Sequence, residues 1–222
     1  MPRHHPDPYL LNDYAAGSLP GAVALAMAVH LDFCRRCRDG MRQLNRLGGE
    51  LLGGLDPVPV AEDAFTRLLQ RLDDSSPASA AEAVQLPAHG GCAGLPRALR
   101  RLAPAGVEQL EWKRSGRGVR TSRLRFGDPQ REVALYRIRA GSRVLEHGHC
   151  GSEITVVLSG AFADHEGCYR AGDFVLRGTT DVHRPVAAPE ADCLCLGVLE
   201  APIRLGGLFG RIANPFLRLH PR

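Results

Sequence analysis

One break in composition limits most strongly what this sequence can fold into. Between residues 73 and 94 the chain turns to Ser, Ala, Pro and Gly, with only scattered apolar residues, which is typical of a linker. Before the break, apolar residues recur at helical spacing, and after it come short β-rich runs between Gly, Asp and Pro turns. We therefore predict an α+β multidomain protein, with an all-α N-terminal region and a C-terminal antiparallel β-barrel or sandwich.

The same spacing predicts the individual elements and the domain limits. Helices are expected over residues 7–16, 20–31, 34–52 and 62–72, and strands over residues 107–113, 121–126, 133–139, 153–158, 173–176 and 193–199. The third helix carries an apolar stripe of Met41, Leu44, Leu47 and Leu51. We divide the chain into a helical domain, a linker, a second domain and a tail, at residues 1–72, 73–104, 105–210 and 211–222.

Composition and charge exclude several classes of protein. With 44% hydrophobic and 23% charged residues the chain is not disordered as a whole. No apolar run approaches the roughly 18–20 residues of a membrane-spanning helix, so we expect no membrane association. The net charge is +4, with the arginine excess in residues 91–222, but the basic stretch 114–125 has few interleaved aromatic residues. We therefore expect no direct nucleic-acid binding.

Cysteine usage points to metal rather than to disulfides. The chain has seven cysteines, an odd number, and several lie close to histidines. This pattern favours metal binding in a reducing compartment, so we expect the protein in the cytoplasm.

The first metal motif is His30-x3-Cys34-x2-Cys37, where the second and third expected helices meet. A spacing of four places His30 and Cys34 one helical turn apart on one face, and Cys-x2-Cys lets two thiolates converge at a helix start. Thiolates with imidazole suit zinc, which needs a fourth ligand, and His4 and His5 are the nearest candidates. In the alternative interpretation the cysteines are core residues and the histidine caps a helix.

His5 ahead of Tyr-Ala-Ala-Gly-Ser-Leu at residues 14–19, followed by this triplet, resembles the zinc-binding anti-sigma domain, most closely that of the ChrR-type anti-sigma factors of bacteria. The resemblance implies a zinc-binding helical domain, with His4 as the fallback for the first of its four ligands, His5, His30, Cys34 and Cys37. It also implies that this domain binds an extracytoplasmic-function-type sigma factor and hides the surfaces that the sigma factor needs for core RNA polymerase. We expect the outer faces of the first and fourth helices to contact this partner, with Glu62 and Asp63 on the fourth.

The second metal motif reads Gly-x5-His147-x-His149-x3-Glu153-x6-Gly from residue 141. The two histidines alternate onto one face of a strand, and the glutamate returns beside them after a tight turn. With His183 farther along the chain, these residues can bind Zn²⁺ or another divalent metal. In the alternatives they are surface histidines on a hairpin, or part of a barrel that has lost its metal.

This second motif meets every fixed position of the first cupin motif. The second cupin motif begins at Gly172 and is looser, because Gly178, Thr180 and Ala187 stand where the family usually has Pro, Gly and Asn. The resemblance implies a cupin barrel with His147, His149, Glu153 and His183 as metal ligands. ChrR-type proteins join the same two modules in the same order, which implies that the cupin is a sensor of singlet oxygen or organic hydroperoxides.

The resemblance therefore implies a regulatory binding protein without catalytic residues. Two other interpretations use the same residues: a metal-dependent cupin enzyme, either a dioxygenase or an isomerase, with an appended helical domain, and a structural protein stapled by two metals. Cys150, Cys193 and Cys195 are possible redox-sensitive residues. For Cys193 and Cys195 we favour packing, because residues two apart on a strand are about 6.5–7 Å apart at Cα, at the upper edge for a disulfide.

Overall fold

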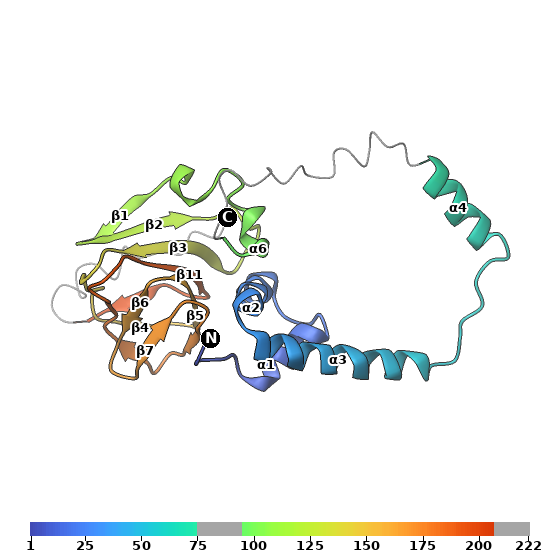
Figure 1. Cartoon of the computed structure of the whole chain (residues 1–222), viewed down its shortest axis with the longest axis horizontal. Helices are drawn as coiled ribbons and strands as arrows, with labels where there is room; N and C mark the ends of the chain where they lie inside the picture. The colour runs from blue at the N-terminus through green and yellow to red at the C-terminus, as the bar shows by residue number, and fades with distance from the viewer. Residues whose placement is uncertain (75–94, 207–222) are drawn as a thin grey trace.

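The computed structural model describes residues 1–74 and 95–206. The four expected helices are confirmed, each within two residues or so of its predicted limits (Figure 1). They are α1 (Pro8–Ala15), α2 (Gly21–Phe33), α3 (Arg35–Gly53) and α4 (Ala64–Asp74). Asp7 caps α1 by accepting the Tyr9 N–H at 2.8 Å. No helix within these described ranges is long and apolar enough to cross a membrane.

The second half is an antiparallel β structure of three sheets. Its six-stranded sheet has the order β1 (Lys113–Gly116), β2 (Val119–Arg123), β3 (Glu132–Ile138), β11 (Cys193–Leu199), β5 (Glu153–Ser159) and β8 (Phe174–Arg177). One three-stranded sheet has the order β10 (Val186–Ala187), β6 (Ala161–Ala163) and β7 (Cys168–Arg170). The other has the order β12 (Ile203–Leu205), β4 (His147–His149) and β9 (Val182–His183).

One predicted strand is wrong, the one over residues 107–113. Val107–Gln109 forms a short 3₁₀ turn, and β1 begins only at residue 113. The chain folds back here because the Trp112 indole N–H donates to the Val107 carbonyl at 2.9 Å. A β-rich composition could not reveal this side-chain contact, which competes with strand pairing.

The helical region and the barrel share one hydrophobic core. Helix α2 is apolar on almost every side, a pattern that requires burial all round. Its residues Leu25, Ala26 and Val29 belong to the same buried cluster as Val156 of β5 and Leu196 of β11. Figure 1 shows α2 between the barrel and the other helices. The two regions are therefore packed together as well as joined by the chain.

The segment assigned to the linker is partly folded. Residues 75–94 lie outside the described residues, but the chain from residue 95 contains a short helix, α6 (Arg97–Arg100). Leu95, Leu99 and Ala103 are buried in the shared core, and α6 packs on α2. Residues 95–104 thus belong to the core and not to a linker. The assigned tail, residues 211–222, lies outside the described residues.

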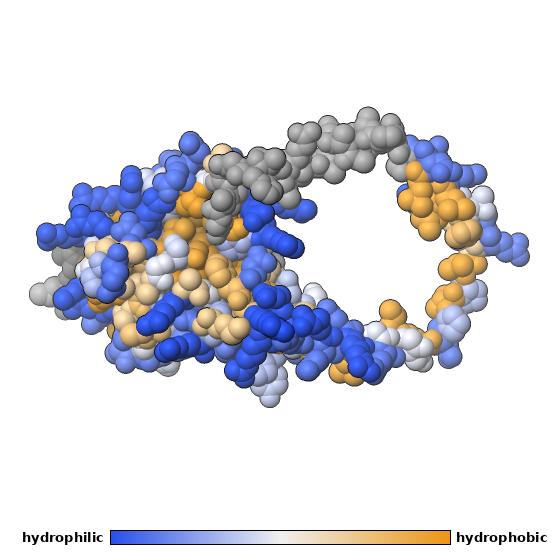
Figure 2. Space-filling view, viewed as in Figure 1, coloured by the Kyte–Doolittle hydropathy of each residue, from blue (hydrophilic) through white to orange (hydrophobic). Residues whose placement is uncertain are grey.

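The C-terminal part of the helical region is much more exposed to solvent than its N-terminal part. Along α3, Met41 and Leu44 are partly buried, whereas Leu47 and Leu51 are 53% and 66% exposed. Helix α4 stands apart from the rest of the molecule in Figure 1, and Figure 2 shows hydrophobic residues gathered on it. We define the exposed apolar stretch as Leu47, Leu51, Leu52, Leu55, Val58, Val60, Phe65, Leu68, Leu69 and Leu72.

Candidate metal centres

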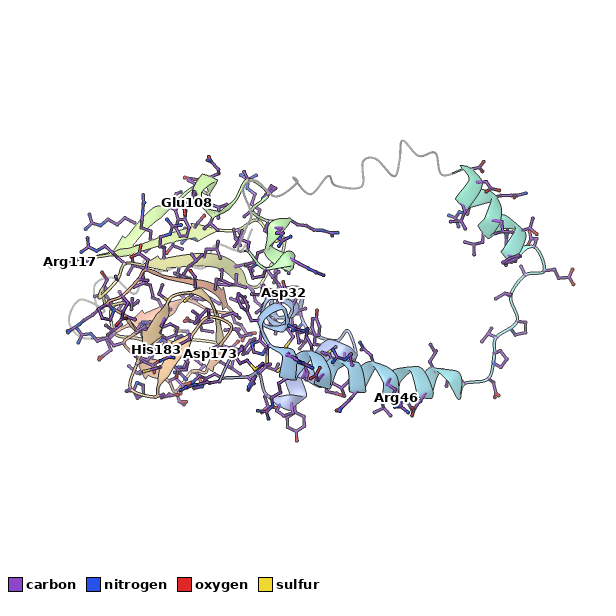
Figure 3. The ribbon with its side chains drawn as sticks, in the orientation of Figure 1. Asp32, Arg46, Glu108, Arg117, Asp173 and His183 are labelled. Atoms are coloured by element: carbon purple, nitrogen blue, oxygen red, sulfur yellow. The ribbon has the colours of Figure 1, made fainter. Side chains whose placement is uncertain are left out.

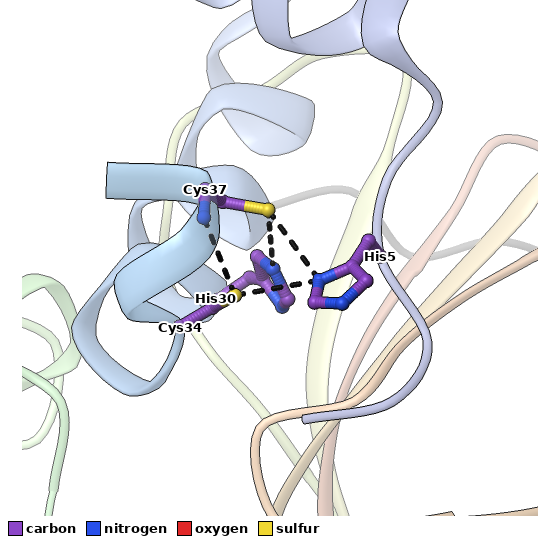
Figure 4. Close-up of side chains that lie close together, drawn as sticks. All are labelled: His5, His30, Cys34 and Cys37. Carbon is purple, nitrogen blue, oxygen red and sulfur yellow. Dashed lines mark hydrogen bonds between the residues drawn. The ribbon is translucent and has the colours of Figure 1, made fainter. Parts of the chain in front are cut away.

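The three residues of the first motif and His5 converge as expected. Cys34 has an extended backbone, which ends α2 and begins α3, so that Cys37 lies in the first turn of the next helix. His5 reaches the same point from the N-terminal segment (Figure 4). His5 Nδ1 lies 3.3 Å from Cys34 Sγ and 3.5 Å from Cys37 Sγ, and His30 Nε2 lies 3.3 Å from Cys37 Sγ. We call these four residues the helical ligand group.

The spacing of these atoms fits a tetrahedral metal. With Zn–S near 2.3 Å and Zn–N near 2.0–2.1 Å, neighbouring sulfur and nitrogen ligands are about 3.5 Å apart. The His30 ring is oriented correctly as well, because its Nδ1 donates to the Gly172 carbonyl at 2.7 Å. A carbonyl only accepts, so Nδ1 carries the proton and the Nε2 lone pair faces the cysteines.

The electrostatics of the helical ligand group also suit a metal. Burial lowers the pKa of His5 and of His30, which favours the neutral form that can bind a metal. Burial, with the hydrogen bond to Cys34, raises the pKa of the Cys37 thiol to about 12 without a metal. A bound metal would have to displace this proton, since the thiolate is the ligand form.

The barrel brings the second motif together, and we call its four residues the barrel ligand group. Strand β4 places His147 and His149 on one face, Glu153 begins β5, and His183 pairs with His147 across β4 and β9. Ring Nδ1 atoms of two of these histidines are held by acceptors: His147 by the Leu145 carbonyl at 2.7 Å and His183 by Asp164 at 3.1 Å. Their Nε2 atoms are therefore unprotonated when the rings are neutral.

Two observations indicate a cation at the barrel ligand group. The Nε2 atoms of His147 and His183 face each other at 3.0 Å, and two lone pairs at this distance repel unless a cation lies between them. In the part of the chain that the structure describes, the Nε2 of His149 is buried and has no hydrogen-bond partner, which is costly in a protein interior. Three imidazoles and a carboxylate suit zinc, iron, manganese or nickel.

The charge state of the carboxylate agrees with metal binding. Burial raises the pKa of Glu153, but the hydrogen bond from His149 and the nearby histidines outweigh it and hold the pKa below its usual value. Burial lowers the pKa of His183. A divalent metal requires an ionised carboxylate and unprotonated imidazole nitrogens as donors, and the lowered pKa values of Glu153 and His183 both favour these forms.

A cavity of about 270 Å³ adjoins the barrel ligand group and is lined mainly by apolar side chains. Cys195 lines it, and its Sγ lies 3.5 Å from that of Cys193, with both thiols free and buried. The hydrogen bond from Cys193 and burial raise the pKa of Cys195. Cys150 is exposed in the turn between β4 and β5 and is not one of the converging ligands.

Sequence reasoning missed the residues that hold these ligands. Asp164 accepts from His183, and Gly172 accepts from His30, yet they lie 19 and 142 residues away in the sequence. No motif spacing relates such positions, since tertiary packing alone brings them together.

The fold and the two ligand groups define a class: a helical metal-binding module packed on a cupin barrel. Residues 103–201 match the ChrR cupin-like domain family. The chain is 35% identical to the anti-sigma-E factor ChrR of Cereibacter sphaeroides, over 98% of this chain and 99% of that protein. The chain therefore belongs to the ChrR family of anti-sigma factors.

The solved structure of a ChrR protein supports this family assignment. The crystal structure of Rhodobacter sphaeroides SigE in complex with the anti-sigma ChrR matches with a TM-score of 0.75 and 33% identity, covering 90% of this chain and 99% of that chain. An RmlC-like cupin from Ralstonia eutropha matches with a TM-score of 0.41 and 16% identity, covering 46% of this chain and 71% of that one.

Proposed function

We propose that this protein is an anti-sigma factor that binds and inhibits an extracytoplasmic-function-type sigma factor through its helical region. The exposed apolar stretch carries the proposal. Residues such as Phe65 and Leu68 are 69% and 54% exposed, and exposed apolar side chains gathered on one helix, as Figure 2 shows on α4, mark a protein interface. An 11-residue helix such as α4 is marginal alone in water, so a partner that covers this surface would stabilise it.

Family membership identifies the chemistry of the partner. The matched structure is of SigE in complex with ChrR, and it aligns along nearly all of the present chain. We infer that a sigma factor covers the exposed apolar stretch and is thereby kept from core RNA polymerase. The two acidic residues just before α4 remain a predicted contact. Glu62 and Asp63 are both exposed, and Asp63 Oδ1 lies 3.2 Å from Arg67 Nη2.

We further propose that the helical ligand group holds Zn²⁺ and that the barrel ligand group holds Zn²⁺ or another divalent metal. At the helical group the metal would be structural, because four protein ligands already surround it. Its thiolates require a reducing compartment, which supports a cytoplasmic location.

The cupin is proposed to sense oxidative stress, either singlet oxygen or organic hydroperoxides, and to trigger release of the sigma factor. The cavity next to the barrel ligand group offers room for a small oxidant, and Cys195 lies in its lining. Cys193 and Cys150 are the other proposed redox-sensitive residues. Release requires that the oxidised or ligated protein bind the sigma factor less tightly than the resting protein does.

A metal-dependent cupin enzyme would use the same ligands and the same cavity. The identity of the metal separates the two functions, since redox-inert zinc disfavours oxygenase chemistry and iron or manganese permits it. The end-to-end relationship to a protein named as an anti-sigma factor favours regulation.

The test of the sigma interface is Leu69→Asp in the full chain, with Gln70→Asp as the matched control on the same helix. Leu69 is 45% exposed, so neither change should alter the free energy of unfolding by more than about 0.5 kcal/mol. We expect Leu69→Asp to weaken binding of the organism's own extracytoplasmic-function sigma factor at least tenfold, measured by calorimetry. Equal affinities for the two variants would contradict the proposed interface.

A further inference from the structure

The barrel completes the surroundings of the helical ligand group through one turn. We call residues 170–174, which connect β7 to β8, the β7–β8 turn. Within it Gly172 has a φ of +90°, and a Cβ there would lie 2.6 Å from Phe33 Cβ and 2.7 Å from Pro2 Cγ. Only glycine allows the turn to approach the helical region so closely. The approach brings the Gly172 carbonyl within 2.7 Å of His30 Nδ1.

The next residue of the turn holds the N-terminal segment. Asp173 is 1% exposed, and its Oδ1 accepts the backbone N–H groups of Arg3 at 2.6 Å and His4 at 3.0 Å. Its Oδ2 accepts the N–H of Arg170 at 2.8 Å, which ties the carboxylate to the turn itself. Residue 5 follows immediately, so Asp173 determines where the His5 ligand starts. Two of the four helical ligands are therefore positioned by the barrel.

The strands on either side of the same turn also reach the barrel ligand group. Arg177 donates to Asp164 at 2.9 Å and to the Tyr169 hydroxyl at 2.7 Å. Asp164 in turn accepts from His183 at 3.1 Å. On its other side, the Tyr169 ring packs on His4, with 4.6 Å between ring centroids. In Figure 3, Asp173 lies between His183 and the helices.

We propose that the β7–β8 turn, with Tyr169 and Asp173 as positioning residues, is a shared support of both ligand groups. Loss of the metal at the barrel group then alters metal binding at the helical group. The proposal rests on the metal assignments under the proposed function. Its physical basis is that residues behind metal ligands orient them, and losing such a residue weakens metal binding about 10–100-fold.

Cobalt(II) can report on the helical ligand group alone. Only that group contains thiolates, so sulfur-to-cobalt charge-transfer absorption arises there and not at the barrel group. We would titrate the metal-free full chain with Co²⁺ and compare the wild type with Asp173→Asn. We expect a 10–100-fold weaker affinity at the helical group and an altered band at saturation, because an asparagine keeps only one acceptor oxygen. Its NH₂ donor must then face either the N–H groups of Arg3 and His4 or that of Arg170.

Asp128→Asn is the matched control. Asp128 is also a buried barrel carboxylate that accepts backbone N–H groups, including that of Ala22 at the opposite end of α2, at 3.4 Å. A merely structural role for Asp173 would make both variants equally unstable, with unchanged cobalt bands. Identical bands and affinities for Asp173→Asn, Asp128→Asn and the wild type would overturn the proposal.

The connection to the barrel group is tested with His147→Ala, which removes one barrel ligand without touching the turn. We expect it to weaken Co²⁺ at the helical group several-fold and to shift the band. Tyr169→Phe keeps the ring on His4 but removes the hydroxyl that Arg177 contacts, so in that background the effect of His147→Ala should shrink. An effect of equal size in both backgrounds, or none in either, refutes the connection. A wild type without any sulfur-to-cobalt band would instead refute the metal assignment itself.

Discussion

The two ligand groups differ in what holds their residues in place. In the barrel, the register of β4 and β9 sets His147 opposite His183, so sheet hydrogen bonds already fix the geometry. In the helical region, His5 comes from a segment without secondary structure, whose backbone at residues 3 and 4 is held by Asp173 of the barrel. The barrel ligand group is therefore local to one fold, whereas the helical ligand group depends on the packing of two regions. A change in that packing can therefore reach the helical site.

The largest expected effect comes from breaking the helical group with Cys37→Ala. Structural zinc contributes on the order of 10 kcal/mol to the folding of small domains, and Cys37 is a buried ligand at the start of α3. We expect the metal content to fall from two ions per chain to one and sigma-factor binding to be lost. Elemental analysis and co-purification measure both. Two ions and full binding in this variant would show that the helical group is not a metal site.

The shared core is tested next, with Leu25→Ala in α2. Leu25 is 7% exposed and lies in the core that joins α2 to the barrel, so the substitution should cost about 2–4 kcal/mol. Because both regions use this core, we expect calorimetry to show one transition at a lower midpoint. Leu52→Ala, at a site that is 70% exposed, is the control and should change little. Two separate transitions, with that of the barrel unchanged, would mean that the regions fold independently.

Breaking the barrel group with His147→Ala should have a smaller effect on partner binding. The variant should lose one metal ion per chain and still bind the sigma factor, with an affinity lowered by about 5–150-fold, since coupling between sites is typically about 1–3 kcal/mol. Metal analysis and calorimetry with the sigma factor check both expectations. Complete loss of sigma binding would show that the barrel group is part of the binding machinery and not a separate sensor.

The smallest effect is expected at the two acidic residues that precede α4. Reversing the charges of Glu62 and Asp63 should leave the free energy of unfolding within about 0.5 kcal/mol of the wild type, because both side chains are exposed. If they contact the sigma factor, the affinity should fall and depend less on salt concentration. Unchanged affinity at low and high salt would exclude them from the interface.

Much of this organisation could be predicted from local patterns. The four helices follow from apolar spacing with caps such as Asp7, and His147, His149 and Glu153 follow from a motif contained within seven residues. The prediction of a strand over residues 107–113 was wrong, because the hydrogen bond from Trp112 to Val107 competes with strand pairing despite the β-rich composition. The apolar stripe predicted on α3 lies on a helix as expected, but two of its four residues, Leu47 and Leu51, are exposed to solvent.

The sequence by itself predicted the short-range members of both ligand groups and the order of the two folds, because ligand spacing and periodicity are properties of neighbouring residues. These members are His30, Cys34 and Cys37 in one group and His147, His149 and Glu153 in the other. Only the tertiary structure decided that α2 and residues 95–104 belong to one core with the barrel. It alone placed Gly172 and Asp173 behind ligands that lie more than 140 residues away. Such contacts form when the chain closes a long loop and buries apolar surface, and no local pattern records which distant residues then meet.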